Sequence, residues 1–494
     1  MNVAPTTSAA ARLPIAMLGV PFDNVTTADT LRLIGDMIAS RKPHYLATAN
    51  VDFVVQAQAD PELRRILLDA DLVVADGMPL VWASRWLGNP LPERVTGSGL
   101  TPLLLALAEE QGWRVFFLGG TEQSVAQAAA NTRARHPKLQ VDAYSPPFGR
   151  LVDARTDDPM NNAEILRRLR EAKPDILLVA FGCPKQERWI YAHYRSLGVP
   201  VSIGVGATID FLAGTMRRAP VWMQKTGLEW VFRLLQEPRR LFRRYAMGMW
   251  VFGWAMLGQL RRLRARRSPR GRPADAALTP VKIASAWRVK LPARLDAACA
   301  TANDAAWRQL LAQPAHLVLD AAGLAFVDST GVALLTRLQK GIRERGHQLV
   351  LVAPSPALIK TLNLMKLSEF FLQAPDLPSA LKLLDDREDC GTVLVDLDLA
   401  SQRAALVWQG EVTAANLGEI ALLTGSRLEQ ARNTLAIDLT GLRFVDTSGI
   451  GLMVKLKKQA ARQGVELRFN GASDTVHKIV SHLRMEEYLF GAPA

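Results

Sequence analysis

The sequence predicts an α/β protein with a Rossmann-like, mainly parallel sheet in its first half and two small α/β domains with mixed sheets in its second half. Short apolar runs alternate with segments of helical periodicity over residues 13–245. A segment with the pattern of a strand, a turn and a helix then occurs twice in the remainder. At 494 residues the chain is too long for one ordinary core, so several domains are expected.

The first half contains five apolar runs that indicate strands: HYLATAN, DLVVAD, WRVFFLGG, DILLVAFG and VPVSIGVG. Amphipathic segments such as Asp60–Asp69 and Glu122–Arg135 lie between them, which predicts helices that connect parallel strands. In such sheets, ligands bind beyond the carboxyl ends of the strands. These runs end in small or polar residues, so we expect the binding site at that edge of the sheet.

Nearly all of the excess positive charge lies in one stretch of the chain. The formal net charge is +13, and residues 233–272 contain twelve arginines and a single acid, Glu237. Such a block usually meets phosphate, either on nucleic acid or on a membrane surface. Within the block, the run Ala246–Leu260 is apolar and contains two tryptophans.

This apolar run favours a membrane surface as the partner. As a helix it would span roughly 22 Å, short of the about 30 Å hydrocarbon core of a bilayer. Arginines on both sides suit a helix that lies in the interface. A tilted, thinly spanning helix and a buried core helix are the alternatives on length. No nucleic acid is expected, because basic and aromatic residues do not interleave outside this run.

The cysteines and histidines exclude two other classes of site. Cys183, Cys299 and Cys390 are far apart and odd in number, which argues against a disulfide framework and fits a reducing cytoplasm. Neither they nor the seven histidines show the spacing of metal ligands. We therefore expect no metal and no cofactor.

The repeat in the second half is specific in its details. DAAGLAFVDSTGVALLTRLQK begins at Asp320, and DLTGLRFVDTSGIGLMVKLKK begins at Asp438. Each copy predicts a strand, an Asp-[Ser/Thr]-[Ser/Thr]-Gly turn and a helix, so one fold has been used twice. Asp, Ser and Thr at a helix start cap free N–H groups, and for a single copy capping alone would explain the motif.

Several residues at the predicted strand ends are candidates for a site. Each also has a plain structural explanation, such as an Asp-Gly turn at Asp76 or a solvated helix start at Gln186 and Glu187. Their occurrence after at least four strands favours a shared site. The candidates are Thr48, Asn50, Asp76, Gly77, Arg94, Thr96, Gly97, Gly119, Gly120, Lys185, Gln186, Glu187, Gly206 and Asp210.

Residues 15–245 resemble the WecG/TagA/CpsF glycosyltransferase family. The resemblance rests on the Thr-x-Asn of residues 48–50, ADG at 75–77, PERVTG at 92–97, FGCPKQERW at 181–189 and the long block GTMRRAPVWMQKTGLEWVFRLLQEPRRLFRRY at 214–245. It implies inverting, metal-independent transfer of N-acetylmannosamine or a related hexose. The donor would be a UDP-sugar and the acceptor linked to undecaprenyl diphosphate, in exopolysaccharide or cell-surface glycan synthesis at the cytoplasmic face of the inner membrane.

The same resemblance implies roles for individual residues. Asp76 would be the general base, with Thr48, Asn50 and Gln186 as its catalytic neighbours, and Thr48 and Gln186 would hold sugar or phosphate oxygens. The remaining candidates would bind substrate. Arginines beyond the sheet would meet the lipid diphosphate and the membrane, because guanidinium groups match phosphate oxygens: Arg233, Arg239, Arg240, Arg243 and Arg244.

The two repeat copies resemble STAS domains, the fold of anti-sigma-factor antagonists, through FVDSTG and FVDTSG. The resemblance implies phosphorylation by a partner kinase at the second hydroxyl of each turn, Thr330 and Ser448. A plain docking role is the alternative for the first copy. We expect the pair to lie across a linker from the first half and to take no part in its chemistry. The competing hypothesis is a catalytically inactive signalling scaffold that acts through these domains.

These observations divide the chain into a tail, a catalytic domain, a basic connection and a repeated pair. The expected ranges are 1–12 for a flexible tail, 13–245 for the glycosyltransferase-like domain, 246–280 for the apolar interface helix and basic linker, 281–386 for the first STAS-like domain and 390–494 for the second.

Overall fold

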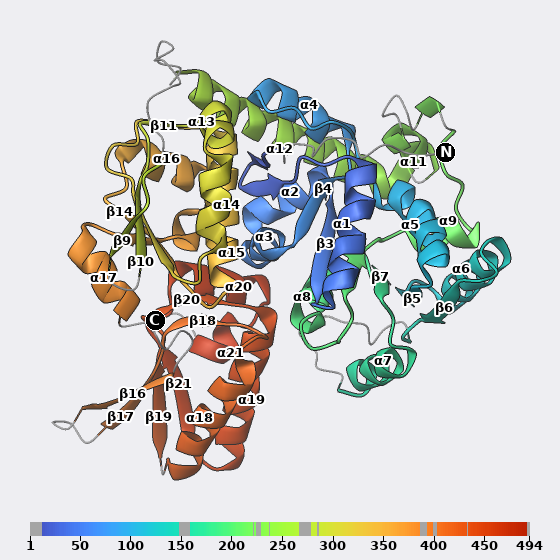
Figure 1. The fold of residues 1–494 in the computed structure, drawn as a ribbon. Helices are drawn as coiled ribbons and strands as arrows, with labels where there is room; N and C mark the ends of the chain where they lie inside the picture. The colour runs from blue at the N-terminus through green and yellow to red at the C-terminus, as the bar shows by residue number, and fades with distance from the viewer. Residues whose placement is uncertain are drawn as a thin grey trace.

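The protein is described by a computed structural model in residues 12–147, 159–220, 222–223, 229–236, 238–265, 278–283, 286–385, 393–398, 403–431 and 433–491. Three α/β parts are visible in Figure 1. We call them the N-terminal domain (residues 12–265), the middle domain (278–385) and the C-terminal domain (393–491). The predicted fold class is confirmed.

A six-stranded parallel sheet forms the centre of the N-terminal domain, in the order β4-β3-β8-β7-β5-β6. Its strands are β3 (His44–Ala49), β4 (Leu72–Ala75), β5 (Arg114–Gly119), β6 (Gln140–Tyr144), β7 (Ile176–Ala180) and β8 (Val201–Gly204). A short hairpin of β1 (Ile15–Met17) and β2 (Val20–Phe22) precedes them. The five predicted strand runs correspond to β3, β4, β5, β7 and β8.

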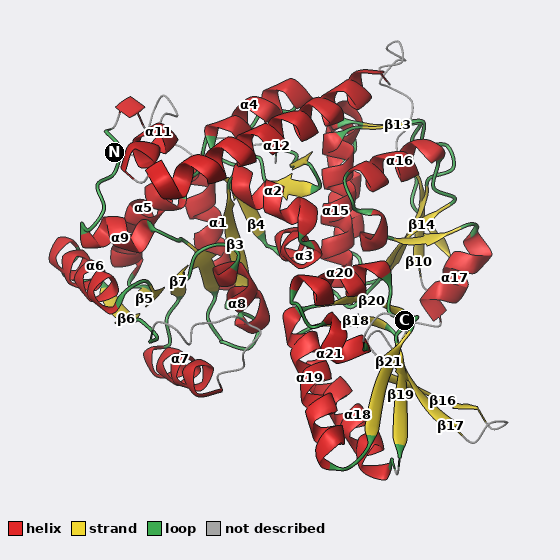
Figure 2. Cartoon of the chain, turned by 180° about the vertical axis from the view of Figure 1, so that it is seen from behind, coloured by secondary structure: helices red, strands yellow, loops and turns green. Residues whose placement is uncertain are grey.

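Helices cover both faces of this sheet, because successive side chains of each strand point to opposite faces. In β5, Phe116 and Leu118 belong to one apolar layer and Phe117 to the other. Figure 2 shows these layers from behind. The helices are α1 (Thr27–Ser40), α2 (Val51–Ala59), α3 (Pro61–Asp69), α4 (Met78–Leu87), α5 (Gly97–Gln111), α6 (Glu122–Arg135), α7 (Pro159–Ala172), α8 (Lys185–His193) and α9 (Thr208–Ala213).

Two further helices, α11 (Glu229–Gln236) and α12 (Pro238–Ala265), extend beyond the sheet. The predicted apolar run lies within α12, so the expected boundary between residues 245 and 246 falls inside one helix. No described helix is long and apolar enough to cross a membrane. In α12, Phe252 and Met256 pack into the core, whereas Trp250 and Trp254 are 68% and 56% exposed.

The middle domain has the five-stranded sheet order β15-β14-β12-β10-β9, in which only β9 is antiparallel to its neighbour. Its strands are β9 (Val281–Ile283), β10 (Ala286–Lys290), β12 (His316–Asp320), β14 (Leu349–Val352) and β15 (Leu372–Ala374), with the short pair β11 (Arg294–Leu295) and β13 (Phe326–Val327) beside them. Its helices are α13 (Ala297–Ala302), α14 (Asp304–Ala312), α15 (Ser329–Arg343), α16 (Pro356–Leu364) and α17 (Leu377–Asp385), with a 3₁₀ turn at Ser368–Phe370.

The C-terminal domain repeats this plan with the sheet order β16-β17-β19-β21. Its strands are β16 (Val393–Asp398), β17 (Arg403–Trp408), β19 (Thr434–Asp438) and β21 (Glu466–Asn470), with the short pair β18 (Gly410–Val412) and β20 (Leu442–Val445). Its helices are α18 (Leu417–Gln430), α19 (Thr447–Arg462), α20 (Asp474–His482) and α21 (Glu486–Phe490). Asp328 and Asp446 cap α15 and α19 as the repeat predicted.

The two repeated domains pack directly on the N-terminal domain. Leu13, Ala16 and Leu68 belong to the apolar core of the middle domain. Gln259 of α12 donates to the Ser329 hydroxyl at 2.8 Å and accepts from the backbone N–H of Leu18 at 3.0 Å. The expected linker is therefore not the sole connection between these domains, because buried apolar and polar contacts also join them.

Candidate active site

A cavity of about 700 Å³ opens at the carboxyl ends of the parallel strands. Residues after β3, β4, β5, β7 and β8 line it, as expected for a sheet of this kind. Nine of the predicted residues lie in its wall: Thr48, Asn50, Asp76, Gly77, Arg94, Gly120, Gln186, Gly206 and Asp210. Five predicted residues are not part of its lining: Thr96, Gly97, Gly119, Lys185 and Glu187.

Asp76 follows β4 on the wall of the cavity. Its backbone N–H donates to the Ala49 carbonyl at 2.8 Å, which fixes the end of β4 beside β3. Its carboxylate accepts from the backbone N–H of Gly97, the first residue of α5, at 3.4 Å. Thr96 caps the same helix by accepting from Gly99 at 2.9 Å. Asp76 is therefore held at a helix start and remains half-buried at the cavity.

The polar side chains of Thr48 and Asn50 also have partners within the protein. The Thr48 hydroxyl donates to the Gly204 carbonyl at 3.0 Å, which joins the ends of β3 and β8. The amide oxygen of Asn50 caps α2 by accepting from Asp52 and Phe53. Both residues line the cavity while they hold its walls in place.

Gln186 differs from the role that the resemblance implies. Its amide oxygen accepts from the backbone N–H groups of Gly182 and Gly206, both at 3.2 Å, and its amide nitrogen donates to Glu187 at 2.7 Å. The side chain is buried, so its polar atoms bind two glycine loops of the cavity wall in place of sugar or phosphate oxygens. Gln186 is a positioning residue in this structure.

Glu187 stabilises that arrangement from inside the domain. Burial raises the pKa of its carboxyl to about 7, against an ordinary value of 4.5. Gly204 packs so closely here that a Cβ would lie 2.6 Å from the Gln186 amide nitrogen. At Gly119, whose φ is +100°, a Cβ would lie 2.7 Å from the Phe181 ring. These two glycines allow the loops to meet behind the cavity.

The Glu187 pKa has a consequence for stability. The folded protein binds this proton more tightly than the unfolded chain, so the stabilisation from protonated Glu187 is fully present below pH 4.5 and is lost as the pH rises to about 7. The shift corresponds to about 3 kcal/mol. We expect the unfolding free energy of Glu187→Gln to fall less than that of the wild type between these pH values, measured by urea unfolding. If the unfolding free energies of the two proteins change in parallel with pH, the Glu187 carboxyl is not buried in its protonated form.

The cavity also includes residues far along the chain that the sequence did not predict. Glu229 and Trp230 of α11 and Gly248 and Met249 of α12 line it. Glu229 forms ion pairs with Arg94 at 3.1 Å and with Arg218 at 3.5 Å. For Glu229 and Trp230, the sequence signal was the long block at 214–245 that resembles the family. No rule of residue spacing places that block beside the strand ends.

The arginines predicted to meet lipid belong to α11 and α12. The side chains of Arg233, Arg239, Arg240, Arg243 and Arg244 lie outside the described side chains. Within the residues that the structure describes, no group of three His, Cys, Asp or Glu side chains could hold a metal ion.

The two hydroxyl turns lie at the domain interfaces. Thr330 is 1% exposed, and its hydroxyl accepts from the Asn89 amide at 3.1 Å. Ser448 is half-buried. Phosphorylation of Thr330, which the resemblance implies, would therefore require the N-terminal domain to move away from this hydroxyl.

Comparison with known proteins agrees with this division of the chain. The profile of the glycosyl transferase WecG/TagA/CpsF family matches residues 15–266. Two STAS profiles match the repeats, one described as Mlab, STAS domain at 282–374 and one as STAS domain at 401–491.

The curated relatives match the N-terminal domain. An N-acetylglucosaminyldiphosphoundecaprenol N-acetyl-beta-D-mannosaminyltransferase of Staphylococcus aureus (strain MW2) is 29% identical over 240 residues, which cover 48% of this chain and 91% of the relative. The protein of the same name from Bacillus spizizenii (strain W23) is 28% identical over 229 residues, which cover 46% and 85%.

Among solved structures, an anti-sigma-factor antagonist (STAS) domain protein from Planctomyces limnophilus is 21% identical, with a TM-score of 0.21, and the match covers 22% of this chain and 99% of that one.

The family profile spans half of the chain and includes every strand of the parallel sheet and the cavity at its edge. The chain belongs to the glycosyl transferase WecG/TagA/CpsF family and carries two STAS domains after its glycosyltransferase domain.

Proposed function

We propose that the N-terminal domain transfers N-acetylmannosamine or a related hexose from a UDP-sugar to an acceptor linked to undecaprenyl diphosphate, with inversion and without a metal. The names of the relatives support this acceptor and this sugar. The observation that carries the proposal is the place of Asp76, half-buried in the cavity wall at a helix start. A carboxylate there can take the proton of an acceptor hydroxyl as that oxygen attacks the anomeric carbon.

The start of α8 can stabilise the departing UDP. This helix begins at Pro184 without a side-chain cap, between Cys183 and Gln186 of the cavity lining. The positive end of a helix dipole favours a diphosphate. This arrangement supports a mechanism in which protein dipoles carry the charge of the leaving group.

UDP binding tests this proposal. Calorimetry with the full chain in the presence of a chelator is expected to show UDP binding, with uridine at least about tenfold weaker because it lacks the charge-assisted hydrogen bonds of the diphosphate. UDP binding that requires a divalent cation, or that does not occur, would contradict the proposed metal-independent mechanism.

The exposed face of α12 supports attachment to a membrane surface. Trp250 and Trp254 form an edge-to-face pair with ring centroids 5.8 Å apart, and Trp86 of the neighbouring α4 is 60% exposed. Figure 1 shows α4 alongside α12 at the same edge of the molecule. Exposed tryptophans next to a basic segment suit the interface of an anionic bilayer.

The double variant Trp250→Ser, Trp254→Ser is expected to bind phosphatidylglycerol vesicles at least about tenfold more weakly, since it removes two aromatic contacts with lipid. Vesicle co-sedimentation measures this. Leu422→Ser is the control, because Leu422 is 74% exposed on α18 in the C-terminal domain. Complete release of the wild type by high salt alone would show that the aromatic face does not bind lipid.

We also propose that the STAS domains have a regulatory or docking role, with Thr330 and Ser448 as candidate phosphorylation sites. The Thr330 hydroxyl faces Asn89, so a phosphate there would have to separate the domains. Phosphorylation by a partner kinase and opening of this interface would therefore be coupled.

A further inference from the structure

Helix α3 is buried to an unusual degree for a helix with charged residues on several sides. All residues from Glu62 to Asp69 are buried, including Arg64 and Arg65. A helix on the surface of a domain normally leaves its polar face in water. Buried charges persist where they are paired, so partners of α3 must lie on more than one side.

The C-terminal domain supplies the partners on one side. The backbone N–H and the hydroxyl of Thr447, the first residue after the Asp446 cap, both donate to the Glu62 carboxylate. Glu411 accepts two hydrogen bonds from the Arg65 guanidinium, at 3.0 and 2.7 Å. The hydroxyl turn of this STAS domain thus binds a carboxylate of its own chain.

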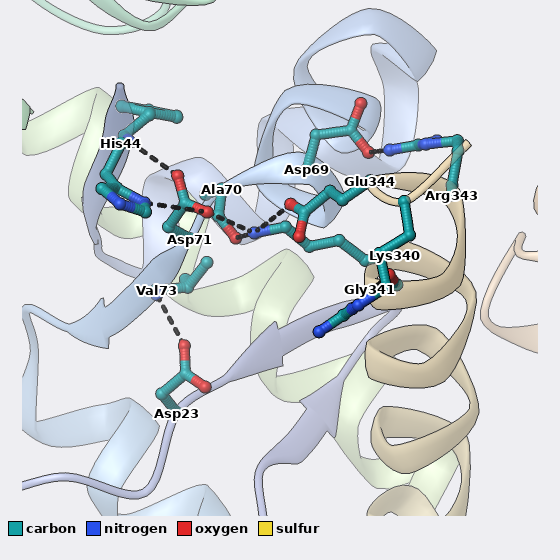
Figure 3. A network of polar contacts seen from close by, with 12 residues as sticks. Asp23, His44, Asp69, Ala70, Asp71, Val73, Lys340, Gly341, Arg343 and Glu344 are labelled. Atoms are coloured by element: carbon teal, nitrogen blue, oxygen red, sulfur yellow. Dashed lines mark hydrogen bonds and ion pairs between the residues drawn. The ribbon is translucent and has the colours of Figure 1, made fainter. Parts of the chain in front are cut away.

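The middle domain holds the other end of α3 (Figure 3). Arg343 of α15 donates to the Asp69 carboxylate, and Lys340 donates to the Ala70 carbonyl at 2.6 Å and to Asp71 at 3.1 Å. Both STAS domains therefore bind the same short helix.

The carboxylates of α3 and the residue before it also hold α8. The second oxygen of Glu62 forms an ion pair with Arg188 at 3.1 Å, and Arg188 donates to Asp60 at 2.6 Å. One turn further along α8, the Tyr191 hydroxyl donates to Asp69 at 2.6 Å. The position of α8 is thus fixed by acids that the STAS domains share.

The start of α8 forms part of the cavity wall. Gln186 accepts from Gly182 and Gly206, which line the cavity, and it precedes Arg188 by two residues. Two residues along a helix is about half a turn, so these side chains leave α8 on nearly opposite sides. A displacement of α8 would move the two glycine loops.

We propose that α3 is an internal docking site for the hydroxyl turn of the second STAS domain, and that this docking positions α8 and the glycine loops for donor binding. Thr447 and Glu62 are positioning residues, since they act through Arg188 and Gln186. That the cavity binds a UDP-sugar donor rests on the proposed function, whereas the docking of the hydroxyl turn on α3 does not depend on it. The partner of this STAS surface is the glycosyltransferase domain of the same chain.

Thr447→Val tests the contact, because it removes the hydroxyl and keeps the side-chain shape. We expect a UDP dissociation constant at least about fivefold higher, the low end of coupling between linked sites. We also expect faster hydrogen exchange in α8. Thr447→Ser should restore both values. Thr434→Val is the matched control, at the exposed start of β19.

Glu62→Gln is a second test of the same contact. It removes the negative charge that pairs with Arg188, so it should also speed hydrogen exchange in α8.

The outcomes separate the docking from the proposed function. Unchanged α8 exchange in both Thr447→Val and Glu62→Gln would overturn the docking proposal, whatever UDP does. Equal weakening of UDP binding by Thr447→Val and Thr447→Ser would also overturn it, because the hydroxyl would then be irrelevant. If the wild type binds no UDP, the proposed function fails, and the exchange measurement still decides whether Thr447 positions α8.

Discussion

Asp76→Asn is expected to bind UDP like the wild type and to lower turnover by a factor on the order of 10² or more. The amide keeps the shape of the carboxyl and can still accept from the Gly97 N–H, which lies 3.4 Å from the native carboxylate. It cannot take a proton from the acceptor hydroxyl. Initial rates of sugar transfer at saturating donor and acceptor measure the effect.

Asp142→Asn is the control for this variant, since Asp142 is exposed on β6 of the same sheet and does not line the cavity. Its turnover should equal that of the wild type. Near-normal transfer by Asp76→Asn would place the base elsewhere or show that the acceptor is already activated.

Arg65→Ala is expected to lower the free energy of unfolding by about 3 kcal/mol, because it removes a buried cation from buried carboxylates. Arg65 pairs with Asp69 at 3.0 Å and with Glu411 at 2.7 Å. Its guanidinium also lies 5.1 Å from the ring centre of Phe370 and 5.2 Å from that of Phe444. One side chain therefore joins all three domains. Urea unfolding of the full chain measures the change.

Arg167→Ala is the matched control for Arg65→Ala. Arg167 pairs with Glu164 and Glu171 on the surface of α7, where exposed ion pairs contribute little to stability. If Arg65→Ala is no more destabilising than Arg167→Ala, the domains do not pack through α3 in solution.

The sequence was sufficient to predict the features that depend on local pattern. Alternating apolar runs gave the strands, and the rule for parallel sheets placed Thr48 and Asp76 at one edge, where both line the cavity. The Asp-[Ser/Thr]-[Ser/Thr]-Gly turns gave the caps of α15 and α19. These features need only neighbouring residues, which explains why they could be predicted.

The features that were missed depend on contacts between distant segments. Residues 60–69 were predicted as an amphipathic helix, which α3 confirms, but its polar side is buried because Glu411 and Thr447 meet it from the C-terminal domain. Gln186 was expected to face the substrate, and its two glycine partners become visible only when β7 and β8 are paired. No local pattern in the sequence indicates such partners.

Helix α12 shows both kinds of result. Its length and composition left an interface helix, a thinly spanning helix and a core helix as alternatives, and the structure shows one buried face and one exposed face. Phe252 and Met256 are buried, whereas Trp250 and Trp254 are exposed. The division follows from the helical period together with the position of the core, and only the first of these can be derived from sequence.

Sugar transfer itself is the most direct test of the proposed activity. The full chain is incubated with a panel of radiolabelled UDP-sugars and a short-chain polyprenyl-diphosphate acceptor that carries N-acetylglucosamine, in the presence of a chelator. We predict that label from UDP-N-acetylmannosamine or a related UDP-hexose enters the lipid product, with the anomeric configuration inverted relative to the donor. A folded, vesicle-bound chain that transfers no sugar from any donor of the panel would contradict the proposal and favour the inactive signalling scaffold.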